Sequence, residues 1–444
     1  MPTEKKKGSW FSRGKLLLTG EYMVLHGATA LALPLRYGQG LEWNGYRSRG
    51  GADHAGRTLE WSTFVREKEW LKAVFGITAD GYVLKSSSHE ERSGFLLEVL
   101  NAAAGLADTS LPAGKAESSV GFDMGWGFGS SSTLISNIAW MFDINPFALH
   151  FAVSRGSGYD IACARSDKPI TYRLKYGRDP WAEAADKARG KKPGDTRDRA
   201  PDEDRGWEPV AAGGREPDEG RSREPDEAMG HEPGEPGKSA GSEFPLPVYS
   251  SAVFNPSFAG CLYFAYTGRK QDSARSVASF LSPPGRQDAP PDATDQGAPP
   301  DATGQGTTPG ATGRGAPPRD PSEAASNTQY RQEAFSAPAG ITGIVSRVTD
   351  ITSRVLEADN VDVFTDLLRE HDRVIAPLVA EVHPQESQFR GFPGYVKPLG
   401  AWGGDFVMIV WKEGRDKLKV ELKQKGVDTI FSWDELIVSA NGKK

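Results

Sequence analysis

The stretch GWGFGSSSTLISNIAWMF, residues 125–142, places three alternating glycines and three serines directly before an apolar pattern. Apolar residues recur from Leu134 to Phe142 at helical spacing, which predicts a helix that begins between Ser130 and Thr133. Two interpretations are open. A glycine–serine turn commonly caps a helix, whereas the unpaired N–H groups of a helix N-terminus, approached closely through flexible glycines, bind phosphate.

Neither of two common nucleotide-binding fingerprints fits this stretch. No lysine follows the glycines, as the P-loop requires, and Ser130 or Ser131 stands where the dinucleotide fingerprint has its third glycine. The sequence therefore offers main-chain N–H groups and serine hydroxyls as the candidate anion ligands.

Composition excludes several classes of protein. The 444 residues carry a net charge of −6, which gives no indication of binding to nucleic acid or to an anionic membrane. Cys163 and Cys261 make no disulfide framework, and no histidine spacing suits a dedicated transition-metal site. Glu21 and His26 interrupt the apolar run 16–35, so it predicts neither a signal peptide nor a spanning helix. A reduced, cytoplasmic compartment is the simplest expectation.

Two low-complexity stretches divide the chain. Residues 182–243 are charged and rich in Pro and Gly, and residues 282–335 repeat a nine-residue unit such as APPDATGQG. Neither holds enough apolar residues to offset the entropy of ordering, so we expect two disordered insertions. The roughly 330 remaining residues suit one enzyme of two lobes. The first lobe would span 1–181, and the second would open at 244–281 and be completed by 336–444.

Alternating strand and helix patterns in the remaining residues predict an α+β fold. We expect amphipathic helices at 66–76 and 93–106, a buried strand within 260–268, and a helix at 272–281. Further along, we expect two or three helices within 341–379 and a strand after the glycine turn at 400–405. Residues 416–426 are either helix or strand.

Three other glycine-flanked segments carry groups that phosphoryl transfer uses. Lys15 begins an apolar strand in GKLLLTGEYMVLHG, Asp160 follows the glycine turn of RGSGYDIACA, and GAWGGD occupies 400–405. Each also has a purely structural interpretation. These are a solvated strand-end lysine, an aspartate that caps a helix, and a tight loop entering a strand.

In order along the chain, GKLLLTGEYMVLHGATALALPL, GWGFGSSST and VKPLGAWGGDFVMIV resemble the three signature motifs of the GHMP kinases. This superfamily contains galactokinase, homoserine kinase, mevalonate kinase and phosphomevalonate kinase. GSGYDIACA is similar to the segment that bears the catalytic aspartate in the mevalonate branch. The resemblance implies a two-lobed fold. Its first lobe would be similar to the second domain of ribosomal protein S5, and its second lobe would be ferredoxin-like.

The resemblance also implies ATP and Mg²⁺ as cofactors and gives roles to individual residues. Asp160 is expected to be the base or charge partner of the acceptor oxygen, and Lys15 to lower the pKa of that oxygen and stabilise charge. The region before Asp160 lacks the glutamate of the mevalonate-kinase pattern, which leaves Ser131 as the expected metal ligand. The implied nucleotide contacts are Gly125, Gly127, Gly129, Ser130, Ser131, Ser132 and, mainly by positioning the adjoining loops, Glu21. The implied substrate contacts are Ser157, Gly158, Gly400, Gly403 and Gly404.

These features predict a small-molecule kinase with mevalonate as acceptor, slightly ahead of phosphomevalonate. Trp402 stands where the third motif usually has a glycine, which would reshape the substrate pocket. A phosphorylated acceptor would need extra cations, for which Arg155, Arg269 and Lys397 are candidates. A decarboxylase of the diphosphomevalonate type and a degenerate kinase fold used for binding remain as alternatives. The expected partner is the small-molecule substrate, with no nucleic acid or membrane, and a homodimer is a candidate assembly.

Overall fold

The two longest described strands, β1 (Lys5–Thr19) and β2 (Ala30–Arg47), pair antiparallel, and β1 carries Lys15. The computed structural model describes residues 5–47, 57–107, 111–178, 243–269, 280, 341–379, 381–400, 402 and 405–438. Most of both expected insertions, at 182–243 and 282–335, and the expected helix at 272–281, apart from Phe280, lie outside these residues.

The first sheet has eight strands in the order β5-β4-β3-β6-β2-β7-β8, with β1 paired to β2. Its remaining members are β3 (Thr58–Val65), β4 (Lys68–Thr78), β5 (Gly81–Ser87), β6 (Pro112–Val120), β7 (Ile170–Arg178) and β8 (Glu243–Ser251). β3 and β6 run parallel, and all other neighbours run antiparallel. Residues 244–251, expected to open the second lobe, thus complete the first sheet instead.

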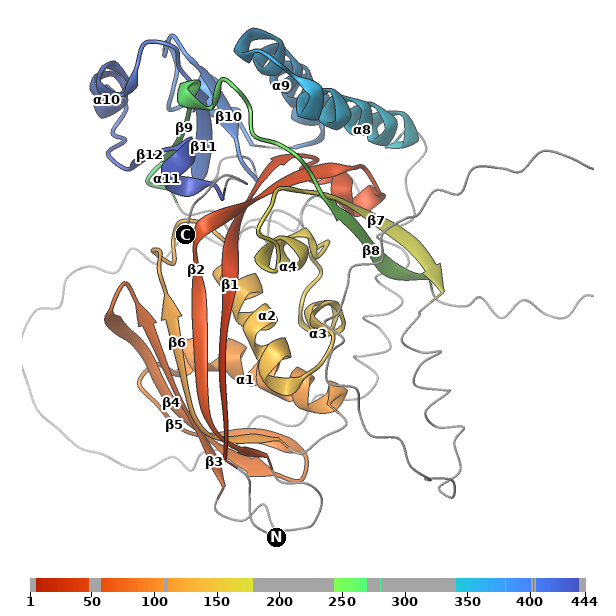
Figure 1. Cartoon of the computed structure of the whole chain (residues 1–444), viewed down its shortest axis with the longest axis vertical. Coiled ribbons are helices and arrows are strands. Elements are labelled where there is room, and N and C mark those ends of the chain that lie inside the picture. The colour runs from red at the N-terminus through yellow and green to blue at the C-terminus, as the bar shows by residue number, and fades with distance from the viewer. Residues whose placement is uncertain are drawn as a thin grey trace, which may run out of the picture.

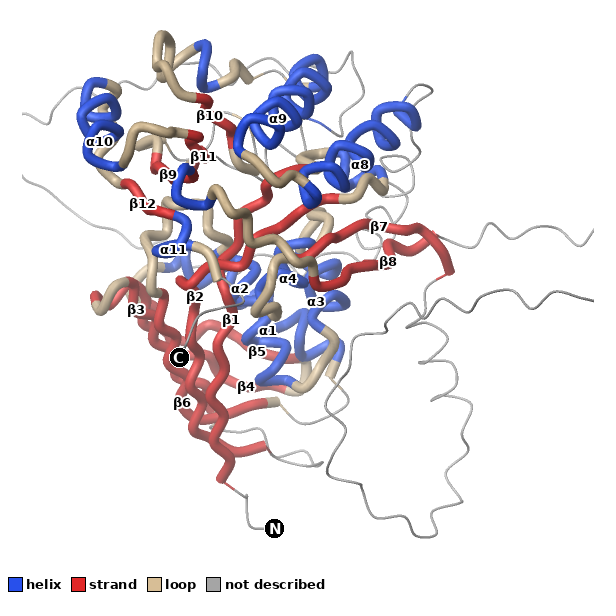
Figure 2. The backbone as a smooth tube through the Cα atoms, turned by 45° about the horizontal axis from the view of Figure 1, so that its top comes forward, coloured by secondary structure: helices blue, strands red, loops and turns tan. Residues whose placement is uncertain are grey.

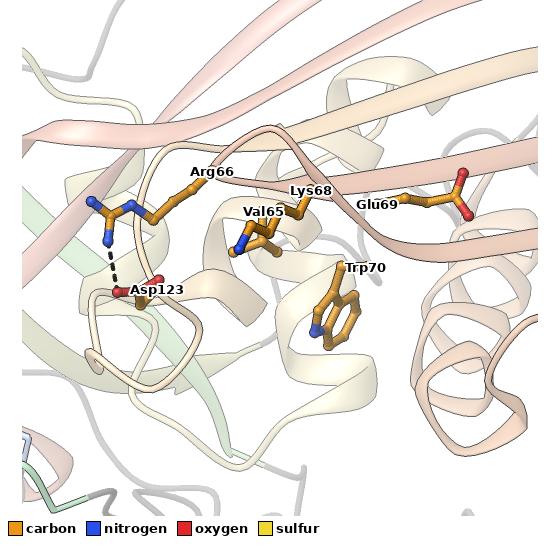
Figure 3. A pocket seen from close by; sticks show the side chains of 6 residues that line it. All are labelled: Val65, Arg66, Lys68, Glu69, Trp70 and Asp123. Carbon is orange, nitrogen blue, oxygen red and sulfur yellow. Dashed lines mark hydrogen bonds and ion pairs between the residues drawn. The ribbon is translucent and has the colours of Figure 1, made fainter.

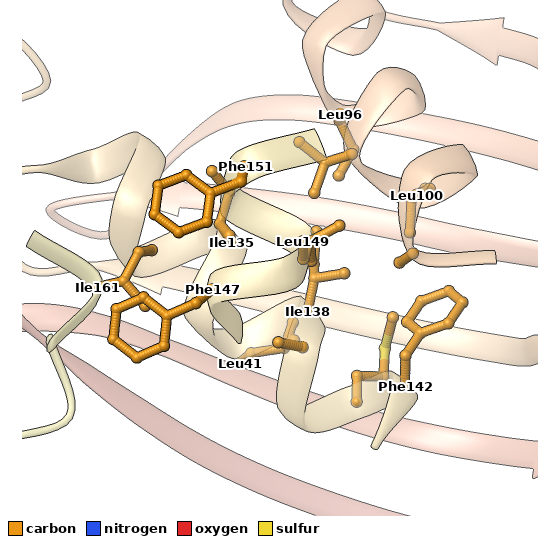
Figure 4. Close-up of a cluster of buried hydrophobic side chains, with 14 of the residues drawn as sticks. Leu41, Leu96, Leu100, Ile135, Ile138, Phe142, Phe147, Leu149, Phe151 and Ile161 are labelled. Atoms are coloured by element: carbon orange, nitrogen blue, oxygen red, sulfur yellow. The ribbon is translucent and has the colours of Figure 1, made fainter. Parts of the chain in front are cut away.

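Four helices pack against this sheet: α1 (Glu90–Leu106), α2 (Ser130–Phe142), α3 (Pro146–Val153) and α4 (Tyr159–Ala164). Figure 1 shows them together beside β1 and β2. Figure 4 shows the core between them, where side chains of α1, α2 and α3 meet Leu41 of β2. The apolar face predicted for the helix after Gly129 is therefore the face that anchors α2, and its predicted beginning is confirmed.

One predicted helix is wrong. The helix expected at 66–76 is absent: Lys68–Thr78 form β4, which is joined to β3 by a two-residue turn at Arg66 and Glu67. Both turn residues have positive φ, 46° and 69°, as the tight turns of β-hairpins require. Leu71, Ala73 and Phe75 are buried on one face of the strand. Apolar residues within 66–76 also recur at helical spacing, but the buried ones are those that alternate along the strand.

The second sheet is four-stranded and antiparallel, in the order β10-β11-β9-β12. Its strands are β9 (Leu262–Tyr266), β10 (Tyr395–Pro398), β11 (Phe406–Val410) and β12 (Ile430–Ser432). The helices of this part are α8 (Ile341–Glu357), α9 (Val361–Ile375), α10 (Arg415–Gln424) and α11 (Trp433–Leu436), of which α8 and α9 lie side by side (Figure 2). Residues 415–424 are thus helix, and the predicted helices within 341–379 are confirmed.

Four short 3-10 helices connect these elements: η1 (Met23–His26), η2 (Ala259–Cys261), η3 (Ala376–Leu378) and η4 (Pro384–Glu386). A second core lies between the two sheets, where Leu18 and Leu33 from the β1–β2 pair belong to the same cluster as Phe264 and Met408. The mixed α+β, two-lobed organisation predicted from the sequence is confirmed. Among the described residues, none of the helices has the length and apolar character needed to cross a membrane.

Candidate active site

The glycine-rich segment 125–132, which we call the phosphate loop, joins β6 to α2 and alternates between two environments. Trp126 and Phe128 are 7% and 0% exposed, and both rings pack against Phe406 of the second sheet. Gly127 and Gly129 take positive φ values of 67° and 89°, which favour glycine over other residues. The aromatic residues therefore anchor the loop between the lobes, while the glycines shape its backbone.

The N-terminus of α2 has no side-chain cap. Gly129 is the N-cap residue, and the first turn holds no acidic side chain. Ser132 Oγ donates to the carbonyl of Gly129 at 2.8 Å, and Thr133 Oγ1 donates to Gln39 Oε1 at 2.6 Å. Ser131 is exposed, and within the described part of the chain its hydroxyl makes no hydrogen bond. The helix N-terminus is thus open to an external anion.

Lys15 lies against the phosphate loop. Its backbone N–H donates to the carbonyl of Phe128, and its Nζ donates to the carbonyl of Gly127, both at 3.0 Å. Burial alone would lower the pKa of Lys15, but Tyr159, Asp160 and Asp405 raise it above its ordinary value. The side chain is therefore a stable ammonium beside the loop.

Asp160 is the second residue of α4, which follows Gly158, a glycine with φ of 84°. Its Oδ1 accepts a hydrogen bond from Ile161 N at 3.0 Å, so it does not serve as the N-cap. Ser157 and Gly158 are buried, and Tyr172 OH donates to the carbonyl of Ser157. The structure thus brings the expected catalytic pair, Lys15 and Asp160, within electrostatic reach of one another.

Asp405 is a site residue that the sequence reasoning missed. Its carboxylate lies so close to Gly127 that a Cβ atom there would clash with it, and it helps to raise the pKa of Lys15. Asp405 is 8% exposed and its carbonyl accepts from Thr267 N at 2.9 Å. Asp405 is the last residue of GAWGGD, the segment whose glycines were expected to contact the substrate, and this acidic residue was the available signal in the sequence.

Glu21 lies in a different environment. It is 1% exposed and belongs to an interlobe charge cluster that we define as Glu21, His371, Asp372, His383 and Lys397. Lys397 is 0% exposed and donates to Glu21 Oε1, so it is buried rather than offered to a substrate. No hydrogen bond or ion pair among the described residues joins Glu21 to the phosphate loop. The cluster went unnoticed in the sequence because its members are far apart along the chain.

The expected substrate side is described in part. Gly400 has φ of 75°, and no atom of the described residues other than its chain neighbours lies within 4 Å of where its Cβ would be, whereas Gly403 and Gly404 lie outside the described residues. Trp402 is 1% exposed, its N–H donates to Tyr22 OH at 3.3 Å, and its ring packs edge-on against His383. Trp402 thus fills space between η1 and the 383–386 turn. Arg155 and Arg269 are exposed.

A pocket of about 470 Å³ opens at the turn between β3 and β4. It is lined by Val65, Arg66, Lys68, Glu69, Trp70 and Asp123 (Figure 3). Arg66 pairs with Asp123 at 2.9 Å, and its guanidinium lies 5.5 Å from the ring centre of Trp126. The pocket thus includes Asp123, two residues before the phosphate loop, and Arg66, which contacts Trp126 of the loop. The pocket was not predicted because residues 66–76 were expected to be helical.

No protein-family model matches the sequence, and no curated protein matches it. Solved structures do. Streptococcus pneumoniae phosphomevalonate kinase in complex with phosphomevalonate and AMPPNP is 11% identical over 96% of this chain and 99% of that chain, with a TM-score of 0.50. L. major mevalonate kinase in complex with R-mevalonate is 12% identical, with coverages of 99% and 98% and a TM-score of 0.48. Lactococcus lactis galactokinase complexed with galactose is 10% identical, with coverages of 95% and 89% and a TM-score of 0.44.

At such identities the similarity concerns the fold alone. The chain has the mixed α+β fold of GHMP kinase structures over nearly its whole length, which confirms the predicted fold class. A similarity at 11% identity selects no branch of that superfamily and no substrate.

Proposed function

We propose that this chain is an ATP-dependent small-molecule kinase that transfers the γ-phosphoryl group to a hydroxyl of mevalonate. The observation that carries the proposal is the contact of Lys15 Nζ with the Gly127 carbonyl at 3.0 Å, with Asp160 near enough to raise the pKa of Lys15. A cation, a carboxylate and an open helix N-terminus are the groups that phosphoryl transfer requires in one place.

The phosphate loop fits the triphosphate of ATP. The uncapped N-terminus of the 13-residue helix α2 presents N–H groups and the positive end of the helix dipole. Gly127 and Gly129 take positive φ values, so the loop backbone adopts a conformation that residues with a side chain rarely take. We assign nucleotide contacts to Gly125, Gly127, Gly129, Ser130, Ser131 and Ser132. The Ser131 hydroxyl, exposed at the start of the helix, is our candidate metal ligand.

Bound MgATP would supply the electrophilic phosphoryl group and a divalent charge that offsets the phosphates. The protein would contribute positioning and charge. The raised pKa of Lys15 keeps it cationic at neutral pH, where it stabilises the negative charge that develops during transfer. The Asp160 carboxylate, at the first turn of α4, is placed to accept the proton of the acceptor hydroxyl.

The pocket beside β3 and β4 suits the nucleoside part of ATP. Its lining includes Trp70, Lys68 and Arg66, and Arg66 contacts Trp126 of the phosphate loop. Aromatic and guanidinium planes stack on nucleobases without strong base specificity. We therefore propose that the base lies in this pocket while the phosphates reach the α2 N-terminus.

Mevalonate is our first acceptor and phosphomevalonate the alternative. Lys397 was one of three cations expected to bind the phosphate of a phosphorylated acceptor, but it is buried and paired with Glu21. This supports an acceptor that carries a hydroxyl in place of the phosphate. Arg155 and Arg269 are the two exposed cations of that expected set.

A coupled assay of ADP release, run with mevalonate, phosphomevalonate, homoserine or galactose, tests the proposal. We expect ADP release that requires Mg²⁺ and is fastest with mevalonate. Faster release with phosphomevalonate would establish the alternative acceptor. Release of carbon dioxide from diphosphomevalonate would establish the decarboxylase, and ATP binding without acceptor-dependent turnover would overturn the kinase.

A further inference from the structure

The interlobe charge cluster lies outside the groups assigned to phosphoryl transfer, and it joins three distant parts of the chain. Glu21 lies in the turn before η1, His371 and Asp372 lie at the end of α9, and Lys397 lies on β10. Lys397 Nζ contacts Glu21 Oε1 and lies 3.0 Å from Asp372 Oδ1. A single ammonium therefore links the first lobe to two elements of the second.

We infer that Lys397 is a positioning residue: its ion pairs with Glu21 and Asp372 hold β10 and, through the pairing of β10 with β11, keep Asp405 against Gly127 of the phosphate loop. The inference rests on the proposed function only in taking Gly127 to be part of a nucleotide site.

Burial explains why this lysine is held so firmly. Its side chain is fully buried, and a buried ammonium persists only when it is paired and hydrogen-bonded. Its Nζ also donates to the carbonyl of Pro398 at 3.0 Å. Burial alone would lower the pKa of Lys397, but the carboxylates of Asp372 and Glu21 raise it above its ordinary value. The contacts around Nζ thus fix the side chain and the strand that carries it.

Other members of the cluster fix the two carboxylates. Gly20 N–H donates to His371 Nε2 at 3.0 Å, and the same nitrogen lies 3.2 Å from Glu21 Oε2. Asp372 Oδ2 accepts from Tyr395 OH at 2.5 Å and lies 3.0 Å from His383 Nε2. The carboxylate of Asp372, which lies on α9, is therefore fixed by His383 beside the 383–386 turn and by Tyr395 of β10.

The path from Lys397 to the phosphate loop is short and passes through strand pairing. Lys397 and Pro398 end β10, which pairs with β11 in the register Pro398 to Val407. The N–H of Leu399 donates to the carbonyl of Phe406 at 3.2 Å, which extends this pairing to the start of β11. Asp405 directly precedes β11, and its carboxylate packs on Gly127. A shift of β10 would therefore reach Gly127 through Asp405.

The test compares amide hydrogen exchange in a peptide covering 125–132 between the full-length wild-type chain and Lys397→Met. We expect exchange there to become about tenfold faster in the variant, since a loop that loses its packing partner opens more often. Leu418→Ala is the matched control. Leu418 is equally buried but belongs to the core of Val396, on the opposite face of β10 from Lys397. It should lower the melting temperature without changing exchange in 125–132.

A double-mutant cycle with Asp405→Asn tests the route. If Lys397 acts through Asp405, the effects of the two substitutions on exchange in 125–132 should be strongly non-additive. Should Lys397→Met fail to fold, the variant Glu21→Gln/Lys397→Met, which removes both opposite charges, replaces it. Unchanged exchange in 125–132, or an acceleration equal to that in Leu418→Ala, would overturn the positioning role.

Titration of the same proteins with AMPPNP and Mg²⁺ separates this inference from the proposed function. Failure of the wild-type chain to bind AMPPNP would overturn the nucleotide site, while the exchange data would still decide the role of Lys397. If the wild-type chain binds, we expect Lys397→Met to bind about tenfold more weakly and Leu418→Ala to bind as the wild type does.

Discussion

The carboxylate of Asp405 occupies the space that a side chain on Gly127 would need. The two residues come from opposite lobes and are 278 positions apart in the sequence, yet a Cβ atom does not fit between them. Gly127 also has a φ of 67°, which strains any residue with a side chain. Position 127 is therefore restricted to glycine for two independent physical reasons.

Gly127→Ala should damage both stability and binding. The strained backbone and the displaced Asp405 should reduce the free energy of unfolding by about 1–3 kcal/mol. The affinity for AMPPNP should fall about tenfold or more, because the loop that offers N–H groups changes shape. Urea unfolding and calorimetric titration measure the two effects.

Gly343→Ala is the control for that substitution. Gly343 lies within α8 and has nothing near the position of an added Cβ. Alanine is the better helix former by roughly 0.5–1 kcal/mol, so this variant should become slightly more stable and bind nucleotide unchanged. A similar loss of affinity in both variants would contradict the special role of Gly127.

Asp160→Asn should separate binding from turnover. The amide keeps the size of the side chain but accepts no proton, so kcat should fall about a hundredfold to ten-thousandfold while AMPPNP affinity changes little. Single-turnover kinetics and titration measure these quantities. Asp80→Asn, at an exposed turn before β5, should change neither. Normal turnover in Asp160→Asn would remove Asp160 from the mechanism.

Lys15→Met should lower kcat by a similar factor, and the wild-type pH profile should show no loss of activity caused by Lys15 between pH 7 and 9. The raised pKa of Lys15 keeps the ammonium charged until the pH exceeds its ordinary value of 10.5. Steady-state rates across this range test the expectation. A fall in kcat below pH 9 that is absent from Lys15→Met would contradict it.

The motifs of the site were predictable from the sequence because each combines a local backbone requirement with a chemical group. Glycines at 127 and 129 and the apolar face of α2 predicted an open helix N-terminus, and the structure describes one. Lys15 and Asp160 were found through their glycine-flanked segments. The sequence did not predict that Lys15 and Asp160 lie close together, because this depends on how β1, α2 and α4 pack.

Features that depend on long-range packing escaped prediction. The cluster of Glu21, Asp372 and Lys397 consists of common charged residues whose burial only the fold determines. Residues 68–78 carry apolar residues at both helical and alternating spacing, so local pattern alone did not decide between helix and strand. That error also hid the pocket, because its wall is the turn between β3 and β4.

Filling that pocket should weaken binding of the nucleoside and spare the phosphates. Val65→Trp places an indole in the space lined by Arg66 and Trp70, and AMPPNP affinity should fall about tenfold. Inorganic triphosphate should bind as it does to the wild type. Val83→Trp, at an exposed position of β5, is the matched control. Equal losses for AMPPNP and triphosphate would show that the substitution disturbs the phosphate loop instead.

Asp372 should make stability depend on acidity. Burial would raise its pKa, but Lys397 and the hydrogen bonds from His371 and His383 hold the pKa far below the ordinary value of 3.8. A lowered pKa in the folded state means that the stabilisation is fully present above 3.8 and is lost as the pH falls below it. Urea unfolding between pH 3 and 7 should therefore show that the free energy of unfolding declines toward acid pH, and that this decline is shallower in Asp372→Asn.

The variant Asp372→Asn should also lose about 3–5 kcal/mol of the free energy of unfolding at pH 7, because it breaks a buried ion pair. Asp366→Asn, exposed on the same helix, should keep the wild-type profile, and an unaltered slope in Asp372→Asn would contradict the linkage.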